Sequence, residues 1–294
     1  MRPEMPSIDR DSFTLDFVVA GFSKCGTTSL CNILSRHPDI CVSSEKEPYF
    51  FCAEDFEDRW DWYLGLFSHG ASGQLHGEGS TYYSNVDQEV SSRENLLKLY
   101  PKLKIIFIAR NPFDRLESSY KEMHHRGPEF GFDANFGMRN MLRQNSNMLD
   151  DTRYWSRLKN YLDYFPEDQI HVVFLEDLKR NPEIVIRKCL HFLDIDSTPC
   201  LEYTQLNAGT DKLYDSKLLR SMRRFAIVRR CLNLLPARTY NRILKRLSLR
   251  KSFSGRIEWD DESRAYIAGE LRSEVSQFLD YANKPADFWG SEWL

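Results

Sequence analysis

The chain has 294 residues, of which 41% are hydrophobic and 28% are charged, an ordinary composition for a globular protein with a sizeable core. Lys and Arg number 40 against 43 Asp and Glu, so the net charge of −3 excludes polyanion binding through overall charge. Any basic site must therefore be local. The seven cysteines are scattered without CxxC spacing, which predicts reduced thiols and excludes a disulfide framework or zinc site.

The amino-terminal segment, residues 1–14, is polar, and we expect it to be frayed. It has no apolar run behind a basic start, so no signal peptide is predicted. No stretch approaches the roughly 20 apolar residues that a membrane span requires. We therefore expect a cytoplasmic protein.

A strand, a tight turn and a helix follow one another three times along the chain. The strands are predicted at 16–21, 104–110 and 170–178, and the helices that follow them at 27–38, from Pro112 onward, and at 181–195. Asn111 and Asn181 each precede a proline and are expected to cap the second and third helices. This repetition predicts an α/β fold, a single P-loop-like domain over 1–294 with a central parallel sheet flanked by helices. Ligands are expected at the carboxyl ends of the strands.

A glycine-rich loop joins the first predicted strand to the first predicted helix. It runs Gly21-Phe22-Ser23-Lys24-Cys25-Gly26-Thr27-Thr28-Ser29. A helix start offers unpaired backbone N–H groups and a positive dipole end, which suit an anionic phosphate. The glycines let the backbone curl around a ligand, and Lys24 places a charge where a leaving oxygen becomes negative. The loop predicts a phosphate site, with a plain strand–helix turn as the alternative; Cys25 is interpreted as a packing residue.

The loop differs from the nucleoside-triphosphate loop GxxxxGK[ST] at one decisive position. Gly21 and Gly26 have the glycine spacing of that loop, but Thr27 stands where it requires lysine. A magnesium-dependent small-molecule kinase is therefore disfavoured, although it remains an alternative. A non-catalytic module that only binds a nucleotide is a second alternative.

The run from Lys24 to Leu30 resembles the 5′-phosphosulfate loop of sulfotransferases that use 3′-phosphoadenosine-5′-phosphosulfate (PAPS), with the pattern K-[ST/G]-G-T-[TR]-x-L. A second family signature is an arginine at a strand end and a serine eight positions later, which resembles Arg110 and Ser118. The resemblance implies that this arginine and serine bind the 3′-phosphate, and an arginine fork suits phosphate. The implied PAPS-binding residues are Lys24, Cys25, Gly26, Thr27, Thr28, Ser29, Arg110 and Ser118.

Further segments resemble the glycosaminoglycan (heparan sulfate)-type branch of this family and its bacterial relatives. Lys46–Phe51, KEPYFF, resembles the E-x-x-F-F segment, in which the glutamate is the catalytic base. Glu78–Tyr83, EGSTYY, resembles E-K-[ST]-x-x-Y, with Gly79 in place of the lysine. The closing segment, 260–279, resembles the last helix of that branch. The similarity covers most of 16–195 and resumes near 250.

Sulfuryl transfer needs a held donor, a positive charge at the leaving oxygen and a base for the acceptor proton. Lys24 is the candidate for the charge. Glu47 is the candidate for the base, because the two phenylalanines after Pro48 and Tyr49 could desolvate its carboxyl group and raise its pKa. An exposed loop carboxylate is the alternative. Glu78 and His76 are reserves, the latter because small-molecule sulfotransferases use a histidine on the corresponding strand.

The segment 216–251 contains twelve Lys and Arg residues and no Asp or Glu. It is interpreted as a basic helical insertion: a solvated helical pair, a clamp over the cofactor or an anionic acceptor, or an interfacial element that makes peripheral membrane contact. Nucleic-acid binding is disfavoured because no recognised motif accompanies the charge. Arg250 and Lys251 echo the basic final cofactor loop of the family, so the resemblance adds them to the PAPS site.

These observations predict a PAPS-dependent sulfotransferase. It would transfer a sulfuryl group directly to a hydroxyl, or less readily an amine, of a small-molecule or carbohydrate acceptor. The second product would be 3′-phosphoadenosine-5′-phosphate (PAP). No metal is required by this chemistry.

Overall fold

The computed structural model describes residues 9–126, 137–195, 212–223, 225, 237–253, 257 and 259–294. The chain forms two compact units. The first comprises Met1–Asn111, Asp150–Leu206 and Glu270–Leu294, and the second comprises Pro112–Leu149 and Asn207–Gly269. Each unit combines segments that are far apart in the sequence, and the single-domain assignment stays a prediction. None of the helices in the described ranges combines the length and apolarity needed to cross a bilayer.

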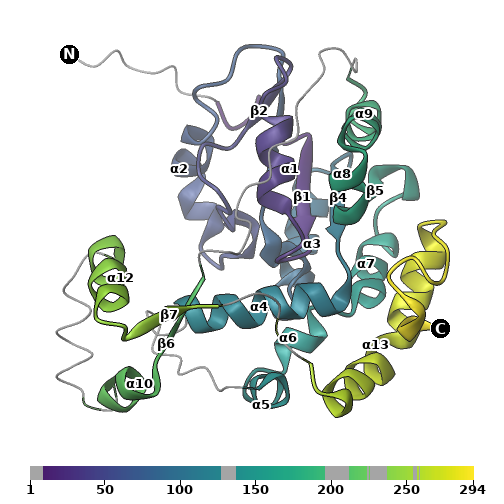
Figure 1. The fold of residues 1–294 in the computed structure, drawn as a ribbon. Coiled ribbons are helices and arrows are strands. Elements are labelled where there is room, and N and C mark those ends of the chain that lie inside the picture. The colour runs from purple at the N-terminus through teal and green to yellow at the C-terminus, as the bar shows by residue number, and fades with distance from the viewer. Residues whose placement is uncertain are drawn as a thin grey trace. The chain divides into compact units, whose positions relative to one another are not determined.

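The first unit is built on a five-stranded sheet with the order β2-β3-β1-β4-β5 (Figure 1). Every neighbouring pair in it is parallel. The strands are β1 (Phe17–Gly21), β2 (Ile40–Val42), β3 (Leu75–Glu78), β4 (Lys104–Ala109) and β5 (Ile170–Phe174). This confirms the predicted α/β fold with a central parallel sheet flanked by helices, because every strand is followed by a helical segment.

The helices of the first unit cover both faces of this sheet, as Figure 1 shows. They are α1 (Thr27–Leu34), α2 (Trp60–Gly65), α3 (Glu89–Leu99), α7 (Tyr154–Leu162), α8 (Leu175–Arg180) and α9 (Pro182–Phe192). Short 3₁₀ turns are η1 (Phe50–Cys52), η2 (Phe56–Arg59), η3 (Thr81–Ser84), η5 (Glu167–Gln169) and η6 (Ser291–Trp293).

The second unit is mainly helical and includes a two-stranded antiparallel pair. Its elements are α4 (Pro112–Arg126), α5 (Met138–Gln144), most of α6 (Asn147–Asp150), β6 (Leu213–Asp215), α10 (Lys217–Arg223), α12 (Ala237–Arg246) and β7 (Arg250–Ser252). The predicted closing helix is α13 (Asp261–Tyr281), which begins in the second unit and continues into the first.

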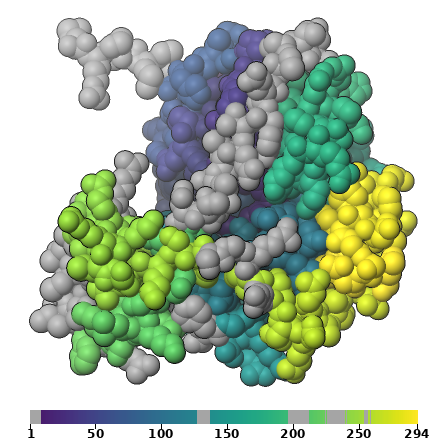
Figure 2. Space-filling view, in the orientation of Figure 1, coloured from purple at the N-terminus to yellow at the C-terminus, as the bar shows by residue number. Residues whose placement is uncertain are grey.

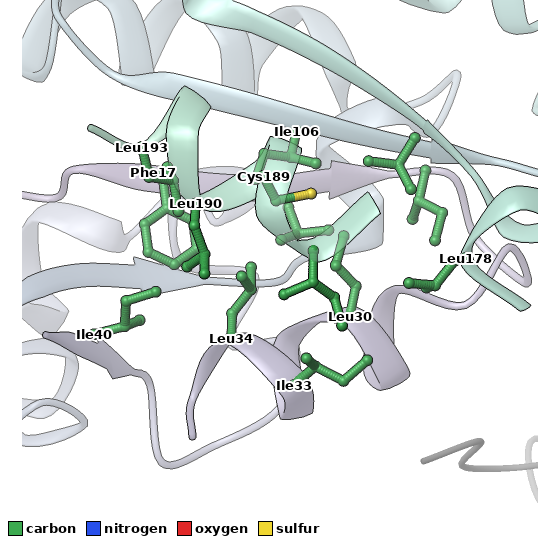
Figure 3. Packing of buried hydrophobic residues seen from close by; sticks show 14 of the residues in the cluster. Phe17, Leu30, Ile33, Leu34, Ile40, Ile106, Leu178, Cys189, Leu190 and Leu193 are labelled. Atoms are coloured by element: carbon green, nitrogen blue, oxygen red, sulfur yellow. The ribbon is translucent and has the colours of Figure 1, made fainter. Parts of the chain in front are cut away.

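One apolar cluster joins the sheet to the helices that pack on it (Figure 3). Phe17 and Ile106 contribute from the central strands, Leu30 from α1, and Leu190 from α9, and all are buried. Burial of such side chains supplies about 1.5–3 kcal/mol each, so the cluster is a main source of stability for the first unit. It holds α1 against the sheet and thereby fixes the loop that precedes this helix.

Three local predictions differ from the structure. The strand predicted over 170–178 ends at Phe174, and a helix begins at Leu175, because Leu175 and Leu178 reach the core at helical spacing. Asn181 occupies the N-cap position of α9, but its side chain makes no capping hydrogen bond. The predicted fraying of 1–14 is wrong for its end, since Phe13 is buried and stacks on His76; residues 1–8 lie outside the described ranges.

The carboxyl-terminal segment closes the first unit beside β5 and α8. Lys284 forms an ion pair with Asp177 at 2.5 Å and lies over the ring of Phe174. The side-chain amide of Asn111 donates to the carbonyl of Trp289 at 2.7 Å. In Figure 2 this segment, in yellow, lies against the green surface of α8 and α9. The residues after α13 therefore belong to the packed structure.

The pairing of Gly77 with Phe17 leaves no room for a side chain at 77. A Cβ atom there would lie 2.1 Å from the ring of Phe17. We expect Gly77→Ala to lower the free energy of unfolding by about 2 kcal/mol through overpacking, measured by urea titration. Gly269→Ala is the matched control, because a Cβ at this helical glycine meets nothing within 4 Å. Gly269→Ala should raise the free energy of unfolding by about 1 kcal/mol, because alanine favours a helix more than glycine does. Equal effects of the two changes would contradict the packing argument.

Candidate functional site

The glycine-rich loop begins where β1 ends and stops where α1 begins, as predicted. A Cβ at Gly21 would lie 2.0 Å from the Oγ of Ser84, so only glycine lets the strand approach η3 so closely. Gly26 has a φ of 103°, and a Cβ there would lie 2.8 Å from Leu175. Both glycines are therefore required by the shape of the loop.

The loop presents hydrogen-bond donors at a helix start. The N–H groups of Ser29 and Leu30 donate to the carbonyl of Gly26, at 3.0 and 3.1 Å. Within the described part of the chain, those of Gly26, Thr27 and Thr28 donate to no other residue. The first turn of α1 contains no acidic residue, so its positive dipole end is not neutralised there. Lys24, half-buried with a φ of 67°, adds a cation from the same loop. Such an arrangement suits a phosphate group.

Tyr154 links this loop to the end of β4. Its hydroxyl donates to the carbonyl of Arg110 at 2.9 Å and lies 3.4 Å from the Sγ of the buried Cys25. Because β1 and β4 are parallel neighbours, with Gly21 opposite Phe107, Arg110 emerges at the same edge of the sheet as the loop. The structure therefore brings Arg110 and the phosphate loop to one edge. Ser118 is half-buried on α4, in the second unit.

Glu47 follows β2 and is held by polar partners. Its side chain is 20% exposed and forms an ion pair with Lys46 at 2.9 Å. The hydroxyl of Tyr49 donates a short hydrogen bond to the same carboxylate. Glu47 also lies close enough to Cys31 in α1 to raise the pKa of that thiol, after burial and the charge of Glu78. The carboxylate of the candidate base is therefore held by Lys46 and Tyr49.

The two phenylalanines of KEPYFF do not surround Glu47 as the sequence predicted. The ring of Phe50 stacks on Tyr63 with 4.0 Å between centroids, and Phe51 packs edge-on against the same tyrosine. Both phenylalanines are fully buried in this aromatic cluster. The prediction of an apolar environment for the carboxyl group is therefore wrong, because the apolar side chains are taken into the core.

Glu78 is fully buried at the end of β3 and accepts three hydroxyl hydrogen bonds. The donors are Ser80 at 2.5 Å, Tyr83 at 2.5 Å and Tyr63 at 3.1 Å. Burial raises the pKa of Glu78 to about 7, while the three hydroxyl groups lower it. With no exposed surface and three internal partners, Glu78 is a structural carboxyl group and a poor candidate for the base.

A chain of hydrogen bonds connects Glu78 with the segment that carries Glu47. The Oγ of Ser80, which donates to Glu78, accepts the backbone N–H of Tyr49 at 3.1 Å. The ring of Tyr49 stacks on Tyr82 with 4.1 Å between centroids, and its hydroxyl donates a hydrogen bond to Glu47. Burial and the bond to Glu47 raise the pKa of this tyrosine, so its hydroxyl keeps its proton and acts as a donor. The turn η3 thus positions Tyr49, and Tyr49 holds Glu47.

His76 lies away from the phosphate loop, which corrects its inclusion among the possible bases. It is level with the residue before β1, and the chain rises about 16 Å along the strand from that residue to Gly21. Its backbone N–H donates to Asp16 at 2.7 Å, and its Nδ1 lies 3.1 Å from the carbonyl of Thr14. His76 therefore fastens the chain before β1 at the opposite edge of the sheet.

Arg250 is buried inside the second unit, which corrects its assignment to the cofactor. Its guanidinium forms an ion pair with Asp215 at 2.9 Å and donates to the carbonyl of His125 at 2.5 Å. It is 1% exposed, so its donors serve the β6–β7 pair and the end of α4. Lys251 is exposed, and its assignment to the cofactor stays a prediction. In the predicted basic insertion, α10 and α12 are helical as expected, while 224 and 226–236 lie outside the described ranges.

The loop geometry agrees with what the chain resembles in sequence. The family model for the sulfotransferase domain matches residues 14–229. The chain belongs to the sulfotransferase family. It is therefore an enzyme of sulfuryl transfer, and the kinase and non-catalytic alternatives are set aside.

Curated relatives of this sulfotransferase include bifunctional heparan sulfate N-deacetylase/N-sulfotransferases. The human protein 2 is 26% identical over 302 residues, which cover 95% of the chain and 31% of that protein. Protein 1 of Caenorhabditis elegans is 26% identical over 213 residues, covering 67% of the chain and 24% of that protein. The chain thus spans at most about a third of the length of these relatives. The predicted likeness to the heparan sulfate branch is confirmed.

Among solved structures, a sulfotransferase from Alicyclobacillus acidocaldarius has the same fold. It superposes with a TM-score of 0.65 at 20% identity, covering 94% of this chain and 99% of that one. The fold of the sulfotransferase described here is therefore shared over nearly its whole length.

Some residues of the candidate site act by holding other residues, and the sequence alone did not indicate them. Tyr49 and Ser84 carry no charge and occupy no specified position in the family patterns, so their contacts emerge only in the fold. A signal existed for Tyr83, which ends the segment resembling E-K-[ST]-x-x-Y and donates to the glutamate that begins it. The first and last residues of this motif, Glu78 and Tyr83, are therefore joined by a hydrogen bond across one turn.

The raised pKa of Glu78 predicts a pH dependence of stability. The folded chain keeps a proton on Glu78 that the unfolded chain releases above its ordinary pKa of 4.5. Stability from this group is therefore full below pH 4.5 and is lost as the pH rises to about 7. We expect the free energy of unfolding of the wild type, relative to Glu78→Gln, to fall by about 3 kcal/mol over this range.

Urea titrations of both proteins across this pH range would measure the difference. The pKa of Glu89 is also raised to about 7, chiefly by burial. This residue is present in both proteins, so their difference isolates Glu78. A difference that does not change with pH would contradict the assignment.

The bond from Tyr49 to Glu47 predicts a catalytic effect without a direct contact to the acceptor. We expect Tyr49→Phe to lower kcat for sulfuryl transfer about tenfold, because Glu47 loses the donor that orients it. The KM for the sulfuryl donor should be unchanged, and kcat must be taken per folded protein, because a loss of folding lowers the apparent kcat without changing KM. Tyr82→Phe is the matched control, since it keeps the stacked ring pair. Equal kcat values for the two variants would contradict a positioning role for Tyr49.

Proposed function

We propose that this sulfotransferase uses PAPS as its sulfuryl donor and releases PAP. The observation that carries the proposal is the donor set at the start of α1: three backbone N–H groups, with Lys24 in the same loop. A 5′-phosphosulfate carries its negative charge at one end of an extended nucleotide, which suits such a helix start. The residues that would hold this end are Lys24, Cys25, Gly26, Thr27, Thr28 and Ser29.

Arg110 would bind the 3′-phosphate of the same nucleotide. It follows β4 directly, at the sheet edge from which the phosphate loop also emerges, and a guanidinium can donate two parallel hydrogen bonds to phosphate. The hydrogen bond from Tyr154 to its carbonyl fixes the backbone of Arg110 relative to Cys25 in the loop. This supports two phosphate contacts at one edge. Ser118 stays a predicted partner of the 3′-phosphate.

The transfer would proceed in a single in-line step. The acceptor oxygen or nitrogen forms a bond to sulfur while the bond from sulfur to the bridging phosphate oxygen breaks. The acceptor proton passes to the carboxylate of Glu47, and the electron pair of the broken bond stays on the phosphate of PAP. Lys24 would stabilise that developing charge. The partly exposed Glu47 suits the role of base better than the fully buried Glu78.

For the acceptor we propose a carbohydrate that presents a hydroxyl or an amine. The relatives named as heparan sulfate N-sulfotransferases support a sugar, and their names place the sulfuryl group on nitrogen. Paired assays with an amino sugar and its N-acetylated form would separate the two acceptor atoms. Transfer only to the free amine would indicate N-sulfation, while equal transfer to both would indicate a hydroxyl. The cytoplasmic location stays a prediction, which fractionation of the native source would test.

Calorimetric titration with PAP tests the donor assignment. We expect PAP to bind the wild type and to bind Arg110→Ala about tenfold to a hundredfold more weakly, because a charged hydrogen-bond pair is lost. Arg187→Ala is the matched control, since that arginine pairs with Glu183 on the exposed face of α9. It should bind PAP as the wild type does. Binding of ATP with magnesium in place of PAP, or equal PAP binding by both variants, would overturn the proposal.

A further inference from the structure

The second unit carries an exposed surface on which apolar and basic side chains alternate. We call it the basic–apolar surface and define it by residues of α10, α12 and the positions next to them. Its apolar members are Leu218, Met222, Phe225, Ile243 and Leu247, and its exposed basic members are Lys217, Arg242, Lys245 and Arg246. Figure 2 shows both helices at the surface on the left. The function proposed above does not use any of these residues.

Helical spacing gathers the apolar members of this surface into stripes. Leu218 and Met222 are four positions apart on α10, and Phe225, which lies beyond the end of this helix, is also exposed. Ile243 and Leu247 repeat the spacing at the end of α12. The interior contacts are made by different residues, because Leu219 and Leu244 are buried together in a small core. The exposed stripes are therefore additional to the core of the unit.

The apolar exposure is concentrated and not scattered. Eleven large hydrophobic side chains are exposed in the described part of the chain, and five of them belong to the basic–apolar surface. Leu218 is 62% exposed, Phe225 65% and Leu247 61%. Isolated exposed apolar residues are normal on a soluble protein, but a gathering of this kind marks an interaction surface.

The charge of the surface selects the kind of partner. The segment 216–251 contains twelve Lys and Arg residues and no carboxylate. Asp215, which precedes the segment, is 3% exposed and is occupied by Arg223 and Arg250. The surface is therefore positive as well as apolar. A second copy of the chain would bring like charges together, and a soluble polyanion would leave the leucine and phenylalanine side chains in water.

We propose that the basic–apolar surface docks the enzyme on an anionic lipid bilayer. The leucine, isoleucine and phenylalanine side chains would enter the boundary between headgroups and acyl chains, while the lysines and arginines meet the lipid phosphates. This mode of binding needs both kinds of side chain, which is what the two helices present. The inference is independent of the sulfuryl donor and acceptor, since the surface contains none of the residues assigned to them.

Co-sedimentation of the full chain with lipid vesicles tests this proposal. We expect binding to vesicles that contain phosphatidylserine, little binding to phosphatidylcholine alone, and weaker binding as salt is raised. Replacing both Leu218 and Leu247 by serine should weaken binding at least about tenfold. Lys245→Gln should weaken it about fivefold. Ile184→Ser is the matched control, because Ile184 is 56% exposed on α9 of the first unit, and it should bind as the wild type does.

The leucine-to-serine variant also separates docking from folding and catalysis. Its sulfuryl transfer in the absence of vesicles should equal that of the wild type. Failure of the wild type to bind either vesicle would overturn the proposal. Salt-sensitive binding to a soluble polyanion such as dextran sulfate would also overturn it, if the serine variant bound the polyanion as tightly as the wild type. That result would identify the surface as a polyanion site. Concentration-dependent dimers that the serine variant abolishes, without vesicle binding, would equally overturn it.

Discussion

The carboxyl group of Glu78 is the constraint on which the candidate site depends. A carboxyl group without exposed surface is costly to bury unless its oxygens are hydrogen-bonded, and here three hydroxyl groups meet that requirement. The donors come from α2 and from η3 and the residue before it. The chain must therefore bring these segments to the end of β3. Because Ser80 also accepts the N–H of Tyr49, the same carboxyl group fixes the backbone that carries Glu47.

The parallel sheet supplies the other half of the site. Its strands deliver the phosphate loop after β1 and Arg110 after β4 to one edge, and the cluster around Leu30 keeps α1 in place. Gly21 permits β1 to touch Ser84, so η3 contacts the loop as well as Glu78. The loop that would hold the nucleotide and the segment that carries the candidate base therefore both contact η3, through Ser84 and Tyr82 respectively.

Features set by neighbours in the sequence were predictable, and features set by distant partners were not. The strands at Phe17 and Lys104 and the loop between Gly21 and Thr27 follow from local apolar runs, glycines and a helix start, and they were found where expected. The positions of the Phe50 and Phe51 rings depend on contacts with Tyr63, and no local sequence pattern predicts these contacts. The end of β5 was misplaced because Leu175 suits a strand and a buried helix equally well.

The same distinction explains the errors at the candidate site. His76 lies on β3, and only the register with β1 shows that it is level with the beginning of the sheet. The sequence of Arg250 and Lys251 alone indicates a cofactor-binding pair, whereas in the fold Arg250 forms an ion pair with Asp215. A sequence motif can indicate that a charged residue binds a ligand, but the fold determines which partner that residue contacts.

The ion pairs of Asp215 also have an evolutionary consequence. This one carboxylate receives Arg223 and Arg250, and Arg250 is fully buried. Losing Asp215 alone would remove a counter-charge from this buried guanidinium, at a cost of several kcal/mol. Replacing all three by apolar residues together would cost far less. Substitutions at Asp215, Arg223 and Arg250 should therefore occur together. In related sequences, we expect the three residues to be either all retained or all replaced.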